Sequence, residues 1–408
     1  MKHYWKLLSL IVFVSLVTGA FYIQGSLASN GKPNFVIEKR SGDEEVVKNL
    51  VISGSFQARN YFEESLQINH TETVYTSERS FVENNTRSVY FSPEIQRLQQ
   101  AYRTFMRGKI SDPSLFYEDE NYVAYAYINW DQGNMGATRF SFDIEVLEKD
   151  SKEVIVIQEL LPKDRSYSYA SVRDVQWIDG KLKVVAQINP YTNIHTTEIH
   201  LYTFDLKSQQ LTENRLLSSI DDKKNPNTGI NVLTDDEGIG KARGLLIEEV
   251  MWKSVPYGDG FRDEKVNSQF SLYSYETGEQ QPVEKPTFPF DYVSLNDSTI
   301  YFAKKTENSI EIHSYDTEKS NYLDVRIFPF EIPEKIVEEN ISEFPVVIHI
   351  ENGRIYLMSL YKDAQTKASI IVADVKTWDI LYEGTIEQSN PSANEKEYAL
   401  RLYSLQVK

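Results

Sequence analysis

Short apolar runs separated by turn-forming residues follow one another along most of the chain, which is the pattern of an all-β protein. One kind of hairpin, an apolar run followed by a tight turn and a second apolar run, recurs at Val175–Ala186, Tyr292–Ala303, Val347–Met358 and, more loosely, Leu115–Tyr127. Two of the turns are Asp179-Gly180 and Asn352-Gly353, residues that tolerate the positive φ angles of a two-residue hairpin loop. The runs are apolar at consecutive positions, which favours strands buried on both faces between packed sheets.

A second element alternates with this hairpin and consists of a strand, an acidic turn and another strand. It occurs at His200–Leu211, Ser271–Gly278, Ile312–Lys319 and Ile370–Thr377, and more weakly at Asp143–Asp150. In each copy a carboxylate, such as that of Asp205, Asp316 or Asp374, ends the strand and can accept hydrogen bonds from its own turn backbone. One hairpin and one such element together make four antiparallel strands, which is the size of a propeller blade.

The alternating elements predict blades at about 115–160, 170–217, 229–283, 291–328 and 345–387. Further strands are expected at 50–56, 66–75, 88–91 and 398–407. The two chain ends would then complete a ring together, because closure removes exposed sheet edges.

Over residues 110–390, these repeats resemble those of bacterial extracytoplasmic β-propeller proteins of the quinoprotein-like or WD40-like kind. The chain departs from the WD40 pattern because it lacks a Gly-His…Trp-Asp signature, and Trp378-Asp379 follows a turn instead of closing a blade strand. The predicted fold is all-β, a β-propeller-like array of four-stranded repeats with about six or seven blades, one inserted amphipathic helix and an N-terminal transmembrane helix. The propeller-like domain is expected over 48–408, after a polar linker at 29–47.

The N-terminus carries an apolar run, Leu7–Ile23, without charged residues, and Lys2 and Lys6 precede it. With its flanking aromatic residues the run reaches about 20 residues, or about 30 Å as a helix, which matches a bilayer core. We therefore expect residues 4–23 to anchor the chain in a lipid bilayer, with the N-terminus in the cytoplasm. The alternative is a signal peptide cleaved after Ala28, which would make the protein secreted. Both interpretations place the main domain outside the cytoplasm.

One amphipathic helix is expected near residue 100, with Ser92 as its N-cap and Pro93 in its first turn. Its apolar stripe consists of Ile95, Leu98, Tyr102, Phe105 and Met106. The stripe can pack against the β-domain, as amphipathic helices usually do. Alternatively it is a docking face for a partner, with Ile95, Leu98, Tyr102 and Phe105 in contact. A second short helix is expected over 334–344.

Composition excludes several classes of function. The net charge of −17 opposes nucleic-acid binding, which needs basic surface to neutralise phosphates. The chain has no Cys, so disulfides, thiol catalysis and Cys-based zinc sites are excluded. An exported protein without Cys fits the surface of a Gram-positive bacterium, and it cannot carry the acylated Cys of a lipoprotein.

No recognised catalytic or metal motif occurs in the chain. His195 and His200 are five positions apart with Glu198 between them, which is not the spacing of a zinc-protease helix. The segment Asp235–Gly240 is rich in carboxylates but does not follow the EF-hand pattern, so a solvated loop is the better interpretation. We assign no catalytic, cofactor-binding or metal residue and expect no cofactor.

The sequence thus favours a membrane-anchored, extracytoplasmic binding or regulatory protein of the cell envelope. Its expected partners are the lipid bilayer and an envelope or membrane protein, and not nucleic acid. The alternative is a secreted or surface hydrolase acting on an envelope or glycan substrate, since paired carboxylates cannot be recognised from sequence.

Overall fold

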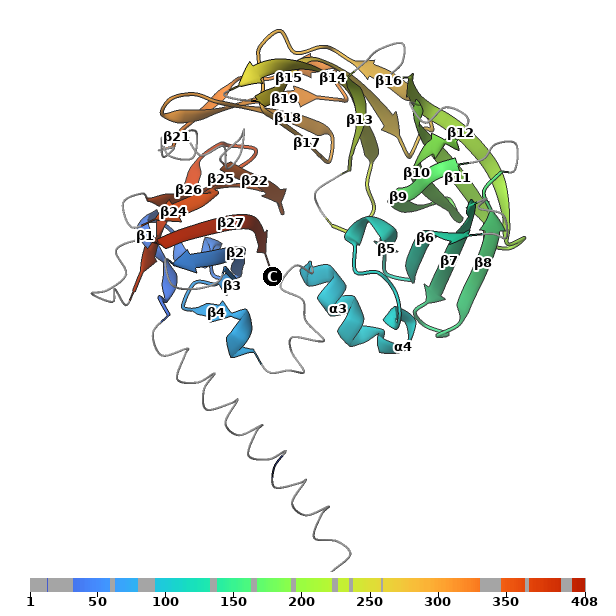
Figure 1. The fold of residues 1–408 in the computed structure, drawn as a ribbon, viewed down its shortest axis with the longest axis horizontal. Helices are drawn as coiled ribbons and strands as arrows, with labels where there is room; N and C mark the ends of the chain where they lie inside the picture. Colours follow the sequence, from blue (N-terminus) through green and yellow to red (C-terminus); the bar gives the residue numbers. More distant parts are fainter. Residues whose placement is uncertain are drawn as a thin grey trace, which may run out of the picture. The chain divides into compact units, whose positions relative to one another are not determined.

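The structure, a computed structural model, describes Phe13 and residues 32–58, 63–79, 92–132, 138–162, 167–191, 196–221, 227–234, 238–257, 260–330, 346–363, 367–389 and 398–407. These residues form six antiparallel sheets of four or five strands, so the chain is all-β as predicted (Figure 1). They fall into two compact units. The middle unit is Glu94–Thr306 with Ile310–Phe328, and the terminal unit is Met1–Pro93, Glu307–Ser309 and Pro329–Lys408.

The middle unit contains four sheets, each built from strands that follow one another in the chain. The first sheet has β5 Phe116–Glu118, β6 Tyr122–Gln132, β7 Thr138–Glu148 and β8 Val154–Leu160. The second has β9 Tyr167–Ile178, β10 Lys181–Pro190, β11 Thr196–Asp205 and β12 Gln210–Asp221. The third has β13 Thr228–Leu233, β14 Gly244–Tyr257, β15 Gly260–Ser274 and β16 Gln280–Val283. The fourth has β17 Tyr292–Asn296, β18 Thr299–Lys305, β19 Ser309–Asp316, β20 Asn321–Tyr322 and β21 Arg326–Pro329.

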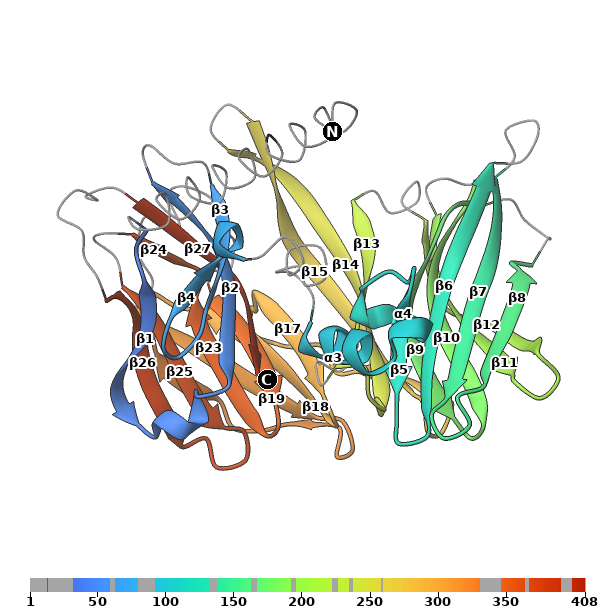
Figure 2. The same ribbon diagram turned by 90° about the horizontal axis from the view of Figure 1, so that it is seen from below.

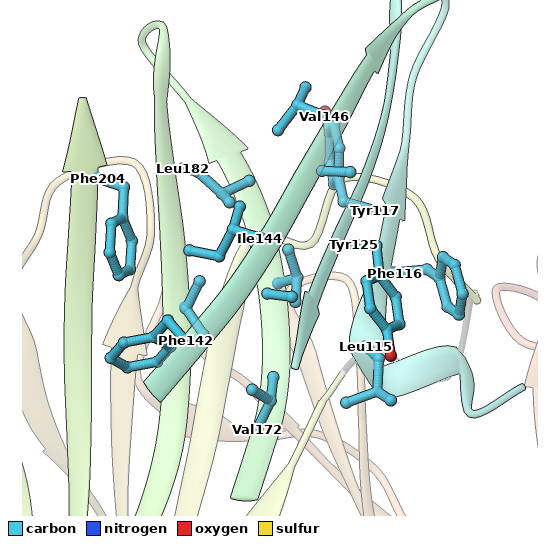
Figure 3. Packing of buried hydrophobic residues seen from close by; sticks show 14 of the residues in the cluster. Leu115, Phe116, Tyr117, Tyr125, Phe142, Ile144, Val146, Val172, Leu182 and Phe204 are labelled. Atoms are coloured by element: carbon cyan, nitrogen blue, oxygen red, sulfur yellow. The ribbon is translucent and has the colours of Figure 1, made fainter. Parts of the chain in front are cut away.

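Apolar side chains hold successive sheets of the middle unit together. Between the first and second sheets, Phe142 of β7 packs edge to face on Phe204 of β11, with ring centroids 5.1 Å apart (Figure 3). The second and third sheets share a cluster that includes Val185 and Leu245, and the third and fourth share one that includes Leu246. Each sheet therefore supplies apolar residues to its neighbours, which is the packing of propeller-like blades.

The terminal unit contains two five-stranded sheets that mix strands from both ends of the chain. In one sheet, the order is β1 Phe35–Gly42, β26 Ile380–Gln388, β25 Ala368–Asp374, β23 Arg354–Ser359 and β22 Val346–Glu351. In the other, the order is β24 Tyr361–Asp363, β27 Tyr398–Val407, β2 Leu50–Ala58, β3 Glu64–Ile68 and β4 Thr73–Tyr75. The expected sharing of strands between the chain ends is thus confirmed at the β1–β26 and β2–β27 pairs.

The prediction of a linker over 29–47 is wrong from Phe35 onward. β1 pairs with β26 from Phe35 to Gly42, and Phe35 and Val47 are completely buried. The charged residues of 38–45 made this segment look like a linker, but they lie on an outermost strand and the turn after it, where charged side chains discourage pairing with another chain. The folded domain therefore begins at least as early as Phe35.

The helical elements are few in the described part of the chain. They are α3 Pro93–Ala101 and α4 Arg103–Met106, which lie beside β5 in Figure 2, and the 3-10 turns η1 Glu44–Val46, η2 Thr76–Glu78 and η3 Pro113–Leu115. No helix among the described residues is long and apolar enough to cross a membrane. The predicted anchor at Leu7–Ile23 lies outside those residues except for Phe13, and so does the helix expected over 334–344.

The two predicted hairpin turns adopt the same backbone conformation. Asp179 and Gly180 have φ angles of 51° and 75°, and Asn352 and Gly353 have 51° and 70°. Positive φ at both central positions is the requirement of a type I′ turn, whose twist matches that of the flanking strands. The structure thus confirms that these turns are equivalent.

Replacing Gly353 tests the importance of this turn. A Cβ at Gly353 would meet no atom within 4 Å, so the effect of substitution comes from the backbone alone. We expect Gly353→Val to lower the free energy of unfolding by about 1–3 kcal/mol, because a β-branched residue is strained at positive φ. Gly353→Asn should have a smaller effect, since Asn tolerates this region. Urea unfolding measures both, and an unchanged midpoint for the Val variant would contradict the assignment.

A candidate ligand-binding cleft between two sheets of the middle unit

The apolar stripe of the predicted helix is buried in the structure. Ile95 and Leu98 of α3 are fully buried, and Phe105 of α4 is 6 % exposed, in the core cluster that also contains β5, β6 and β7 residues. Tyr102 lies between the two helices and packs on the same cluster. This burial favours packing over docking, because these side chains offer little surface to a partner.

An ion-pair cluster fastens the outer side of α3 to the first sheet. Glu118 at the end of β5 has a nearly buried carboxylate that pairs with Arg97 of α3. Lys149 also pairs with it, with Nζ 2.7 Å from Oε1. Two cations on one shielded carboxylate compensate the desolvation of its charge, so the helix is held by charge as well as by apolar contact.

The histidines form no metal site among the described residues. His200 on β11 contacts Glu198 through Nε2 at 2.9 Å and Asn214 through Nδ1 at 2.8 Å. His195 lies outside the described residues. His349 contacts Glu351, and His313 stacks on Phe288 with ring centroids 3.6 Å apart.

The acidic segment Asp235–Gly240 is described only from Gly238 onward. Ile239 is buried in the first core cluster, and its carbonyl accepts a hydrogen bond from the Glu118 amide at 2.7 Å. The end of this segment is therefore packed against the first sheet, in contrast to the solvated loop expected for the whole segment.

A cleft of about 580 Å³ lies between the first and second sheets of the middle unit. Its described lining comes from β6, β9 and the segment that leads into η3, together with Phe140 of β7. Trp130 on β6 is 56 % exposed and Tyr169 on β9 is 45 % exposed, and both line the cleft. Single exposed aromatic residues are common on protein surfaces, but two of them on one cleft define a surface suited to binding.

The cleft runs along strand edges. Residues 168–173 of β9 all line it. Because neighbouring residues of a strand point to opposite faces, a cleft that meets six consecutive residues must follow the edge of the strand. β9 is the last strand of its sheet and pairs only with β10. On β6, the β5 partner stops at Tyr125, so the following residues have β7 on one side and no strand of the described chain on the other.

Backbone amides on both edges are satisfied by the preceding side chain. The Trp130 N–H of β6 donates to Asn129 Oδ1 at 3.0 Å. The Val175 N–H of β9 donates to Asp174 Oδ1 at 2.9 Å. An amide that bonds its own neighbour's side chain is not paired with an adjacent strand, so β6 and β9 are edge strands at these points even though these two amides are themselves satisfied.

Polar groups complete the lining of the cleft. Arg173 donates to Gln187 Oε1 and forms no ion pair with any described residue. It has no Cα partner in β10, because the register shifts between Val185 and Ala186, as in a β-bulge. Asp112 uses Oδ1 to cap the Ser114 amide, and the Ser171 hydroxyl is buried without a hydrogen-bond partner among the described residues.

Sequence reasoning did not identify this cleft. Trp130 stands next to Asp131–Gly136, a segment that is easily dismissed as turn punctuation, and Tyr169 stands in a run of alternating Tyr and Ser at the start of β9. An aromatic residue among polar neighbours at a strand end is the signal that could have drawn attention to both positions. The meeting of β6 and β9 in space, however, cannot be read from the sequence.

A buried polar network lies next to the cleft on the same strand. Asp174 is 7 % exposed and accepts hydrogen bonds from the Tyr275 hydroxyl and, at 3.2 Å, from Gln176 Nε2. Gln176 Oε1 in turn accepts from the Ala242 amide at 2.9 Å, beside a cavity of about 140 Å³. Burial raises the pKa of Asp174 above its ordinary value. The hydrogen bonds from Tyr275, Gln176 and the Val175 amide act in the opposite direction but do not outweigh burial.

No protein-family model matches the chain, and no curated protein sequence matches it. Solved structures of similar fold include a luciferin-regenerating enzyme, at 9 % identity and a TM-score of 0.30 over 72 % of this chain and 94 % of that one. TolB from Acinetobacter baumannii is similar at 8 % identity and a TM-score of 0.29, over 87 % of this chain and 66 % of that one. The Dos1 propeller is similar at 7 % identity and a TM-score of 0.31, over 65 % of this chain and 62 % of that one.

These likenesses concern the fold alone. The chain is a β-propeller-like protein of repeated antiparallel sheets, and that architecture is read from its own strand order.

The burial of Leu98 predicts a large effect of truncation. We expect Leu98→Ala to lower the free energy of unfolding by about 2–5 kcal/mol, as removal of a buried Leu side chain does. Gln100→Ala on the exposed side of α3 is the matched control and should be nearly neutral. Thermal or urea unfolding measures both. A Leu98→Ala variant that melts like the control would mean that the stripe is free for docking.

The raised pKa of Asp174 predicts a pH-dependent contribution to stability. The folded state binds the proton of the Asp174 carboxyl group more tightly than the unfolded state does, in which the pKa of this group is about 3.9. The contribution is therefore complete at lower pH and is lost as pH rises through the folded-state pKa. Relative to the unchanged protein, Asp174→Asn should thus become more stable as pH rises above the unfolded-state pKa and through the folded-state pKa of Asp174.

Asp205 provides a control of opposite sign. Its pKa is lowered, chiefly by the hydrogen bond from the Ser208 amide, so its contribution is present at higher pH and lost as pH falls through its folded-state pKa. Asp205→Asn should therefore become less stable, relative to the unchanged protein, as pH rises. Urea unfolding at a series of pH values separates the two, and parallel pH profiles for Asp174→Asn and the unchanged protein would refute the assignment.

Proposed function

We propose that this chain is a membrane-anchored, extracytoplasmic protein of the cell envelope that binds a ligand in the cleft between β6 and β9. One observation carries the binding half of the proposal: Trp130 and Tyr169, both about half exposed, line the same cleft of about 580 Å³. Large apolar side chains are normally kept from water, and their gathering at a concave surface with polar groups is characteristic of a binding site.

The sequence supports the location. Leu7–Ile23 is apolar, free of charge and of a length that matches a bilayer core, and Lys2 and Lys6 precede it. The domain that follows has many acidic residues and no Cys, which suits a soluble module exposed outside a bacterial cell. We therefore keep the anchored arrangement, with residues 4–23 in the bilayer, as part of the proposal.

The composition of the cleft favours binding over hydrolysis. Glycoside hydrolysis uses two carboxyl groups that face each other across the substrate. Among the described residues that line the cleft, Asp112 is the only carboxylate, and its Oδ1 is engaged in the turn at Ser114. Aromatic residues and hydroxyls make up much of the rest of the lining, which suits recognition.

Site-specific photo-cross-linking tests the proposal. The full chain, in its native membrane, would carry p-benzoylphenylalanine in place of Tyr169. We expect it to cross-link an envelope component, and Trp130→Ala in the same chain should reduce the yield, because truncation of an aromatic anchor weakens binding.

The control places the same photoreactive residue at Leu216 of β12, which is 51 % exposed and lies at the other edge of the same sheet. It should not capture the component seen at Tyr169. Equal capture at both positions, or capture unaffected by Trp130→Ala, would overturn the assignment of the cleft as the binding site.

A further inference from the structure

We propose that the ligand of the cleft is an extended polypeptide segment with an acidic side chain, which adds as an extra strand along the free edge of β9. The proposal rests on the proposed function, since it names the class of ligand for the same cleft. Its first support is the geometry of the lining: six consecutive residues, 168–173, meet the cleft, so that it is the strand edge that faces the ligand.

A free strand edge is a row of N–H and C=O groups, and an extended peptide is the ligand that matches such a row. Six residues of strand span roughly 20 Å, which is the length of a peptide of about six residues. A glycan could stack on Trp130 and Tyr169, but it has no backbone of regularly spaced donors and acceptors to continue the sheet. The consecutive lining of β9 therefore favours a peptide.

The charges of the cleft specify the peptide further. Arg173 has a guanidinium that contacts the neutral Gln187 amide and forms no ion pair with any described residue, in a chain whose net charge is −17. Guanidinium groups bind carboxylates through two parallel hydrogen bonds. A peptide with Asp or Glu at the position that faces Arg173 complements this charge.

The aromatic residues set the pattern of the remaining side chains. In an added strand, alternate side chains point to the same face, so that every second residue can lie against Trp130 or Tyr169. The peptide should thus alternate apolar and polar residues around its acidic position. Such a ligand combines backbone pairing for affinity with side-chain contacts for selectivity.

The test uses the full chain reconstituted in lipid nanodiscs, and the probe is a phage-displayed library of random heptapeptides. We expect enrichment of sequences that alternate apolar and polar residues and contain Asp or Glu. A synthetic copy of the enriched peptide should bind at least tenfold more weakly to the Trp130→Ala and Arg173→Gln chains. Lys181→Gln, an exposed cation in the Asp179-Gly180 hairpin, is the matched control and should leave binding unchanged.

Backbone pairing is tested with two N-methylated versions of the enriched peptide, with methyl groups on alternate amides. The version methylated on the edge that faces β9 should lose binding at least tenfold, and the version methylated on the other edge should keep it. Hydrogen exchange should show slower exchange of amides in 168–173 when the peptide is bound.

Two further outcomes separate this inference from the proposed function. If fragments of cell-envelope glycan bind in a Trp130-dependent manner and no peptide does, the cleft is a binding site and the peptide inference is wrong. If peptides bind but both methylated versions bind equally well, strand addition is wrong. If neither probe binds and the cross-linking at Tyr169 also fails, the proposed function falls together with the inference.

Discussion

Leu245, Leu246 and Ile247 are consecutive residues of β14, and all three are completely buried. Because side chains alternate between the faces of a sheet, such a run forces the sheet to be covered on both faces. Leu245 and Ile247 pack toward the second sheet, and Leu246 packs toward the fourth. This demand for cover on both faces organises the middle unit, because a four-stranded sheet of this kind is stable only as one member of a series of packed sheets.

The same demand explains which features the sequence reveals. Apolar runs on both sides of Asp179-Gly180 and Asn352-Gly353 belong to hairpins whose turn chemistry is local. Because such hairpins alternate with the strand, acidic turn and strand element, five sheets could be located to within a few residues. The sharing of strands between the chain ends followed from the avoidance of free edges. By contrast, β1 was mistaken for a linker, because an outermost strand needs few apolar residues and Phe35, Val36 and Ile37 are too short a run to stand out.

The cleft could not be predicted from sequence patterns, because it is formed by residues that only the packing of two sheets brings together. Trp130 and Tyr169 are nearly 40 positions apart on strands of different sheets, and no periodicity relates them. They face the same cleft because Phe142 and its neighbours press the first sheet against the second, and because β5 is too short to cover the far half of β6. The helices α3 and α4 show the reverse case, since their amphipathic stripe is visible in the sequence and favours packing against the β-domain over docking, without knowledge of what it covers.

Free edges are normally hidden in β proteins, because they invite pairing with other chains. The edges of β6 and β9 that border the cleft are not paired with another described strand, but on each of them one backbone amide is already bonded to a side chain. Asn129 and Asp174 each turn back to bond the amide of the following residue, which blunts the edge at those points. On β9, residues 168–173 precede the bonded amide of Val175, include the irregular register at Arg173, and are the part that lines the cleft. An edge that is blocked on one side of a short open segment limits how far another chain can pair along it, and such a limit distinguishes a binding site from an aggregation hazard.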